Sequence, residues 1–184
     1  MRALLHLLDR LTRLLDGLNE WVGRTIAWLT LAMVLVTFAV VVLRYGFNLG
    51  WIAMQESITY MHALVFMLGA SYTLKHEGHV RVDILYRGMS ARGRAWVDLL
   101  GALLLLLPTC AYILVSSWDY VARAWSLHES SPEPGGLPGV YLLKTAIPVM
   151  AVLLGLQGVA QALHALKVLL GPGLDAPHPR ERGL

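Results

Sequence analysis

Two histidines within long apolar stretches of the sequence are the residues best suited to bind a cofactor. His62 lies near the middle of one stretch, and His164 lies near the end of another. A haem held between two helices needs two facing histidines at one depth. Counted along helices from Trp51 and from Thr145, the two histidines lie about 16 Å and about 28 Å deep. The spacing therefore disfavours a bis-histidine haem site and favours hydrogen-bonded or partner-facing histidines.

A metal site is the second candidate, because His79 and Asp83 are four residues apart and would share one face of a helix. Two ligands without a third hold a metal ion weakly. The intervening run, residues 79–83, alternates polar and apolar residues. A salt-bridged segment at a membrane interface is the better interpretation of this run.

The remaining chemistry-bearing residue types do not form a catalytic group. Cys110 is the single cysteine, which excludes a disulfide framework and a cysteine-rich metal site. The sequence contains no nucleophile–base pair and no glycine-rich phosphate loop. We therefore expect neither enzymatic activity nor a bound cofactor.

Placing charged and amide side chains in the hydrocarbon of a membrane costs free energy, so such residues within apolar stretches usually face protein. Arg44 and Glu56 flank one short turn, and we interpret them as an ion pair; a carboxylate wetted by lipid headgroups is the alternative. Gln157 and Gln161 are four residues apart and would hydrogen-bond across a helix contact rather than recognise substrate. Gly69 would let another helix approach closely.

Composition identifies the class of protein that positions these residues. The chain has 184 residues and 20.3 kDa, with 57% hydrophobic residues, 15% charged residues and a mean hydropathy of +0.58. Soluble domains are about 45–50% apolar and about 25% charged. A soluble enzyme and a disordered chain are therefore excluded, and an integral membrane protein remains. The pI near 9.2 does not indicate nucleic-acid binding, because the position of positive charge matters more in a membrane protein.

Four stretches are long and apolar enough to cross a bilayer, which takes roughly 20 helical residues. They predict an all-α membrane protein with four transmembrane helices, at residues 21–43, 51–74, 95–118 and 141–166, in one domain. Aromatic residues lie near the predicted borders, as in the aromatic belts of membrane proteins. These residues are Trp21, Tyr45, Trp51, Tyr72, Trp96, Trp118, Tyr120 and Tyr141.

The basic residues predict the direction of the spans. Twelve of the 15 lysines and arginines lie in the N-terminal segment up to Arg24, in the 75–94 connection or after the fourth span. The positive-inside rule then places both termini and this connection in the cytoplasm. The 44–50 turn and the 119–140 connection face outward, and the latter is predicted to be an exposed loop because it is rich in serine, proline and glycine.

The first 20 residues form a helical stripe of leucines separated by polar residues, without a signal-peptide cleavage site. They predict an N-terminal amphipathic interfacial helix at residues 1–20, with its leucines in lipid or against a partner. The alternative is a helix that packs only on its own bundle. The proline-containing tail, residues 171–184, is predicted to be disordered.

A series of short segments follows one another along about residues 20–168. In order, they are Arg44-Tyr45, Trp51, Gln55-Glu56, Phe66-Met67-Leu68-Gly69-Ala70, Gly78-His79-Val80-Arg81-Val82-Asp83, Ser130 and Ser131, Gly136-Leu137-Pro138, Lys144, Ile147-Pro148 and Leu156-Gln157. In this order and spacing they resemble the small membrane subunit of tripartite ATP-independent periplasmic (TRAP) transporters, the DctQ-like family. Met54-Gln55 departs from the family pattern.

This resemblance implies a small permease subunit in the bacterial inner membrane. Its partners would be a large membrane subunit, which it scaffolds, and a periplasmic binding protein, which it helps to dock for ion-coupled uptake of a small organic acid. The alternative is a haem- or quinone-associated membrane anchor that uses His62. The residues expected at subunit interfaces are Arg44, Trp51, Glu56, Gly69, His79, Asp83, Leu137, Gln157 and Gln161.

Overall fold

The computed structural model describes residues 2–79 and 84–170, and all regular structure within these ranges is helical. The predicted all-α fold is thus confirmed for this part of the chain. Asp83 and the tail predicted at 171–184 lie outside the described residues. The elements are α1 (Arg2–Phe47), α2 (Ile52–Lys75), α3 (Ile84–Arg87), α4 (Ala91–Gly101), the π-helix η1 (Ala102–Leu106), α5 (Leu107–Ser126) and α6 (Val140–Leu170).

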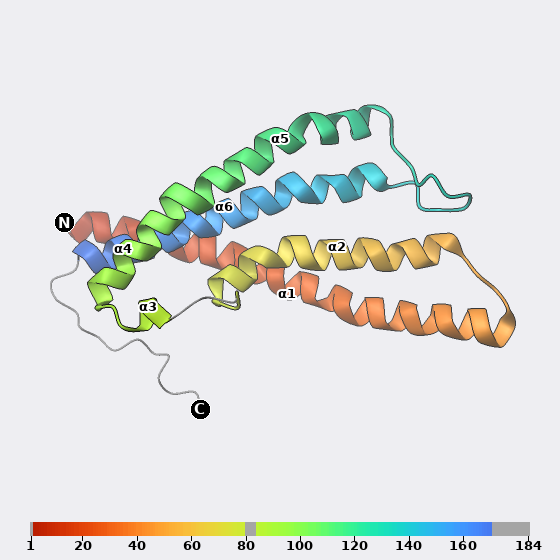
Figure 1. The fold of residues 1–184 in the computed structure, drawn as a ribbon, viewed down its shortest axis with the longest axis horizontal. Coiled ribbons are helices and arrows are strands. Elements are labelled where there is room, and N and C mark those ends of the chain that lie inside the picture. The colour runs from red at the N-terminus through yellow and green to blue at the C-terminus, as the bar shows by residue number, and fades with distance from the viewer. Residues whose placement is uncertain (1, 80–83, 171–184) are drawn as a thin grey trace.

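Helix α6 is the centre of the bundle. It contacts α1, α2, α4, η1 and α5, and α1 also lies along α2 (Figure 1). Many of its buried residues are small, including Ala151 and Ala160, and small residues allow helices to approach closely. Gly158 illustrates this contact, because a Cβ there would lie 2.8 Å from Leu106 Cδ2.

Three helical segments are long and apolar enough to cross a membrane: Leu8–Phe47, Ala91–Ser126 and Val140–Leu170. The sequence predicted four, and the second, residues 51–74, does not reach the same hydropathy although it forms α2. Gln55, Glu56 and His62 lower the hydropathy of this helix.

The N-terminal helix expected at residues 1–20 and the first span are parts of one unbroken helix. The 46 residues of α1 rise about 69 Å, more than twice the roughly 30 Å hydrocarbon thickness of a bilayer. In Figure 1, the first part of α1 lies beside the last part of α6. A large part of α1 must therefore lie outside the hydrocarbon, or the helix must be strongly tilted.

The third span contains one irregular turn. In η1 the N–H of Leu107 donates to the carbonyl of Ala102, five residues earlier. Pro108 follows directly; it has no N–H, and its ring would clash with the carbonyl four residues before it. The wider π turn accommodates the proline, and α4, η1 and α5 all keep contact with α6.

Candidate functional site

A carboxylate on α2 holds the connection between α5 and α6, residues 127–139, which we call the α5–α6 loop. Glu56, in the first turns of α2, accepts hydrogen bonds from the Ser131 hydroxyl and from the Leu137 N–H, the latter at 2.7 Å. The Ser131 N–H donates to the Leu137 carbonyl at 3.1 Å. Two hydrogen bonds therefore hold this part of the loop on α2, and the third closes the loop on itself.

Gly136 allows the loop to lie this close to Glu56. A Cβ at this position would collide with the Ser131 side chain and lie 2.8 Å from Glu56 Oε2. The neighbouring Gly135 has a φ of 80°, a conformation that residues with a side chain rarely adopt. The two glycines thus meet two different requirements, one of space and one of backbone conformation.

A second group of contacts fixes the ends of the loop. Lys144 on α6 pairs with Glu129 at 2.6 Å and lies 4.0 Å from the ring centroid of Tyr120. The Trp125 indole N–H donates to the Thr145 hydroxyl at 2.8 Å. The loop is therefore held to α2, α5 and α6, while its tip remains exposed. The exposed residues include Ser130, Pro132, Glu133 and Pro134.

The predicted ion pair between Arg44 and Glu56 is wrong. The Glu56 carboxylate is occupied by the α5–α6 loop, and Arg44 is exposed and has no ion pair among residues 2–79 and 84–170. The turn that separates the two residues is short, but Glu56 lies on the side of α2 that faces the loop. Leu137, by contrast, lies directly at the Glu56 contact.

An apolar hollow of about 470 Å³ lies beneath the same loop. Tyr60, Leu64, Leu137 and Leu142 are among the residues that line it. The Tyr60 hydroxyl is buried and has no hydrogen-bond partner among the residues that the structure describes. This hollow adds a mainly apolar surface to the underside of the α5–α6 loop.

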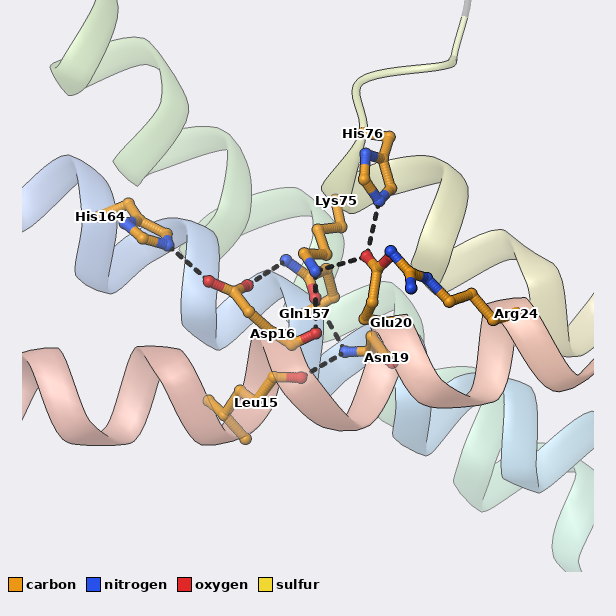
Figure 2. Close-up of polar contacts among 9 residues, drawn as sticks. All are labelled: Leu15, Asp16, Asn19, Glu20, Arg24, Lys75, His76, Gln157 and His164. Carbon is orange, nitrogen blue, oxygen red and sulfur yellow. Dashed lines mark hydrogen bonds and ion pairs between the residues drawn. The ribbon is translucent and has the colours of Figure 1, made fainter.

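A polar cluster joins α1 to α6 near the opposite end of the bundle. Figure 2 shows Gln157 of α6 between Asp16 and Asn19 of α1. The Asn19 amide donates to Gln157 Oε1 at 2.8 Å, and the Gln157 amide donates to Asp16 Oδ1 at 3.0 Å. Asn19 is 0% exposed and Gln157 is 3% exposed, so the hydrogen bond between the two amides is buried away from water. Asn19 Oδ1 is buried too and has no hydrogen-bond partner among the described residues.

Charged pairs surround this cluster. On α6, His164 lies 2.9 Å from Asp16, and Lys167 pairs with Asp9 at 2.6 Å. At the end of α2, Lys75 and His76 contact the Glu20 carboxylate at 2.7 and 2.8 Å (Figure 2). Arg24 completes the group from α1, at 2.7 Å from Glu20. The cluster therefore joins the three helices α1, α2 and α6 by polar contacts.

The other predicted interface residues are not gathered at one place. Gln161 forms no side-chain hydrogen bond within the described part of the chain, and a Cβ at Gly69 would meet nothing within 4 Å. Trp51 is 62% exposed as the N-cap of α2, and His79 is exposed. All four residues remain accessible to a partner.

The histidine chemistry is not supported by the arrangement of the helices. His164 is held by Asp16, whereas His62 is exposed on α2. No group of three or more metal-ligating side chains occurs among residues 2–79 and 84–170. The two histidines therefore do not form a cofactor site in this part of the chain.

Sequence reasoning missed the residues on α1 that pair with α2 and α6. The leucine stripe predicted an amphipathic helix, with packing on its own bundle as the alternative, but no partner was predicted for Asp16, Asn19 or Glu20. Their spacing of three and four residues places them on adjacent faces of the helix, which was the available signal. Lys75-His76 was a second signal, because a cation at the end of a span needs a nearby anion or water.

The two amides offer a test of the cluster by a double-mutant cycle. Asn19→Leu and Gln157→Leu should each cost about 1–3 kcal/mol, because each leaves a buried amide without its partner. The double variant should cost about 1 kcal/mol less than the sum. Unfolding of the purified chain in detergent measures these energies. Gln161→Leu, on the same helix, should change stability by less than about 0.5 kcal/mol; strict additivity of the first two changes would contradict the contact.

Comparisons with known proteins match the chain to one family. The family model of the DctQ component of tripartite ATP-independent periplasmic transporters matches residues 33–168. The C4-dicarboxylate TRAP transporter small permease protein DctQ of Vibrio cholerae serotype O1 is 32% identical over an alignment of 143 residues that covers 73% of this chain and 60% of that protein.

A second similar protein, from Haemophilus influenzae, is provisionally named a TRAP transporter small permease protein. It is 30% identical over 119 residues, which are 64% of this chain and 66% of that protein. The chain thus spans less than two thirds of the length of either relative. No solved structure matches significantly. Because the family model extends from the middle of α1 almost to the end of α6, the chain belongs to the DctQ family of TRAP transporter small permease subunits.

Proposed function

We propose that this subunit scaffolds the large membrane subunit of a TRAP transporter and helps to dock the periplasmic binding protein. The observation that carries the docking proposal is the α5–α6 loop, which is held in place by Glu56 and by the pair of Lys144 with Glu129. A loop that is already ordered loses less conformational entropy when it binds a partner. Its exposed tip is a surface suited to a soluble protein.

The proposed orientation places this loop in the periplasm and both termini in the cytoplasm. The basic residues support it, because most of them lie toward the termini and the 75–94 connection. We also place α2 across the bacterial inner membrane, which brings the number of spans to four. Its 24 residues would rise about 36 Å, and it lies against both α1 and α6.

We further propose that the transporter takes up a small organic acid by ion-coupled transport. The Vibrio cholerae relative, which is named as the small permease of a C4-dicarboxylate transporter, supports an organic acid as the solute. We assign solute recognition to the other two components, in keeping with a scaffolding subunit.

Co-purification from the native membrane in mild detergent tests the assembly. A photoreactive residue in place of Glu133, at the exposed tip of the loop, should crosslink to a periplasmic binding protein. A probe in place of Leu35, exposed in the middle of α1, is the matched control and should not. A large membrane subunit should co-purify in either case. Recovery of the chain alone, or with iron–sulfur or flavin subunits, would contradict the proposal.

A further inference from the structure

The first half of α1 has its polar side turned inward. Leu8, Thr12 and Asn19 are 8%, 1% and 0% exposed, and the polar cluster with α6 lies on this side. Figure 2 shows Asp16 and Asn19 directed at α6. This is the reverse of a helix on the surface of a soluble protein, whose polar side faces water.

The opposite side presents a row of apolar side chains, which we call the leucine ridge. Leu11, Leu14, Leu18 and Trp21 are 43%, 71%, 41% and 67% exposed. They follow one another at intervals of three and four residues, so they share one face of α1. A contiguous exposed apolar surface of this kind marks contact with a membrane or with another protein.

Two arginines border the leucine ridge. Arg10 and Arg13 are three residues apart, and Arg10 precedes Leu14 by four, so the basic and apolar side chains lie on neighbouring faces. Both arginines are exposed, and neither forms an ion pair within the residues that the structure describes. Arg13 interacts electrostatically with Asp9, but that carboxylate is already paired with Lys167. Arg24, in contrast, is neutralised by Glu20. Arg10 and Arg13 are therefore available to an external anion.

The charge beside the ridge favours lipid over protein as its partner. A subunit covering the ridge would need two anions of its own to match the arginines, whereas anionic phospholipids supply acyl chains and phosphates together. Residues 25–43 alone match the hydrocarbon thickness, so the leucine ridge reaches the acyl region when α1 is strongly tilted, as its length allows. We propose that residues 8–21 of α1 bind anionic phospholipid, with the leucine ridge in the acyl region and Arg10 and Arg13 at headgroup phosphates.

Titration of the purified full chain with phosphatidylglycerol, followed by native mass spectrometry, tests the arginines. Arg10→Gln/Arg13→Gln should weaken binding by about fivefold for each arginine, or about 25-fold together. Arg92→Gln/Arg123→Gln removes the same charge from exposed sites on other helices and should change binding less than about twofold. An equal loss in both double variants, or no preference of the native chain for phosphatidylglycerol over phosphatidylcholine, would overturn the proposal.

A nitroxide at Leu14 tests the ridge independently of the arginines. It is attached through Leu14→Cys in a Cys110→Ala background, and the chain is reconstituted in bilayers containing phosphatidylglycerol. Greater accessibility to oxygen than to a water-soluble nickel chelate is expected. Greater accessibility to the nickel chelate would show that the ridge lies in water. Protection from both oxygen and the nickel chelate, seen only after assembly with the large subunit, would show that the ridge contacts protein. Either result would overturn the lipid site, without bearing on docking of the binding protein.

Discussion

Glu56→Ala is expected to release the α5–α6 loop while leaving the helices in place. The carboxylate receives hydrogen bonds from Ser131 and Leu137, and alanine removes both. The Leu137 amide should then exchange its hydrogen on the order of tenfold faster or more, because hydrogen bonds to charged groups are stronger than neutral ones. Hydrogen exchange of the purified subunit measures this, and solute uptake by cells should fall at an unchanged amount of subunit in the membrane.

Glu133→Ala is the matched control for this result. Glu133 lies in the same loop, but its side chain is exposed at the tip. It should leave the exchange of Leu137 unchanged, although uptake would fall if Glu133 itself contacts the binding protein. Unaltered exchange in Glu56→Ala would show that the carboxylate does not hold the loop. Faster exchange with normal uptake would show that an ordered loop is not needed for docking.

Gly23→Leu is expected to lower the melting temperature by about 6–12 °C. Gly23 is buried where α1 meets α2, and a Cβ there would collide with the Cβ and ring of Tyr72. The Tyr72 Cβ cannot move without its backbone, so the two helices must separate. Overpacking of this kind costs about 3 kcal/mol, and each kcal/mol corresponds to about 2–4 °C in a chain of this size. Thermal unfolding in detergent, followed by size-exclusion chromatography, measures the shift.

Gly17→Leu distinguishes this collision from a general effect of glycine replacement. Gly17 lies on the same helix, and a Cβ there would meet nothing within 4 Å. Because leucine favours a helix more than glycine does, the melting temperature should stay the same or rise slightly. Similar losses in both variants would refute close packing at Gly23.

The helices could be predicted from sequence because their signal is local. The predicted span at 141–166 matches α6 to within one residue at its start, and the span at 21–43 lies inside the longer α1, since hydropathy depends on neighbouring residues alone. The loop rich in serine, proline and glycine was also predicted, but α5 continues to Ser126 before it begins. The unbroken α1 was missed because the pattern of leucines separated by polar residues gives way to a continuous apolar run near Trp21, which suggested two elements. No helix-breaking residue separates the two parts, so the helix continues.

The site contacts could not be predicted, because they join residues far apart in the chain. Glu56 and Ser131 are separated by 75 positions, and Asn19 and Gln157 by 138. For Glu56, the nearby Arg44 was a reasonable partner by sequence distance alone. Which partner a carboxylate finds depends on helix rotation and on the path of the loop, and neither leaves a local pattern. Gln157 was correctly expected in a helix contact, but its partner was not predicted.

The π turn at η1 has a consequence for the phase of the buried residues along α4 and α5. Ala95 and Ala102 are buried seven residues apart, as are Cys110, Ser117 and Ala124 in turn, but the step across the turn from Ala102 to Cys110 is eight. The wider turn accommodates the extra residue, so these five buried residues stay on one side of the helix. A relative with one residue fewer here should therefore form an unbroken α-helix with a constant heptad, and its alignment with this chain requires a single-residue gap between Gly101 and Pro108.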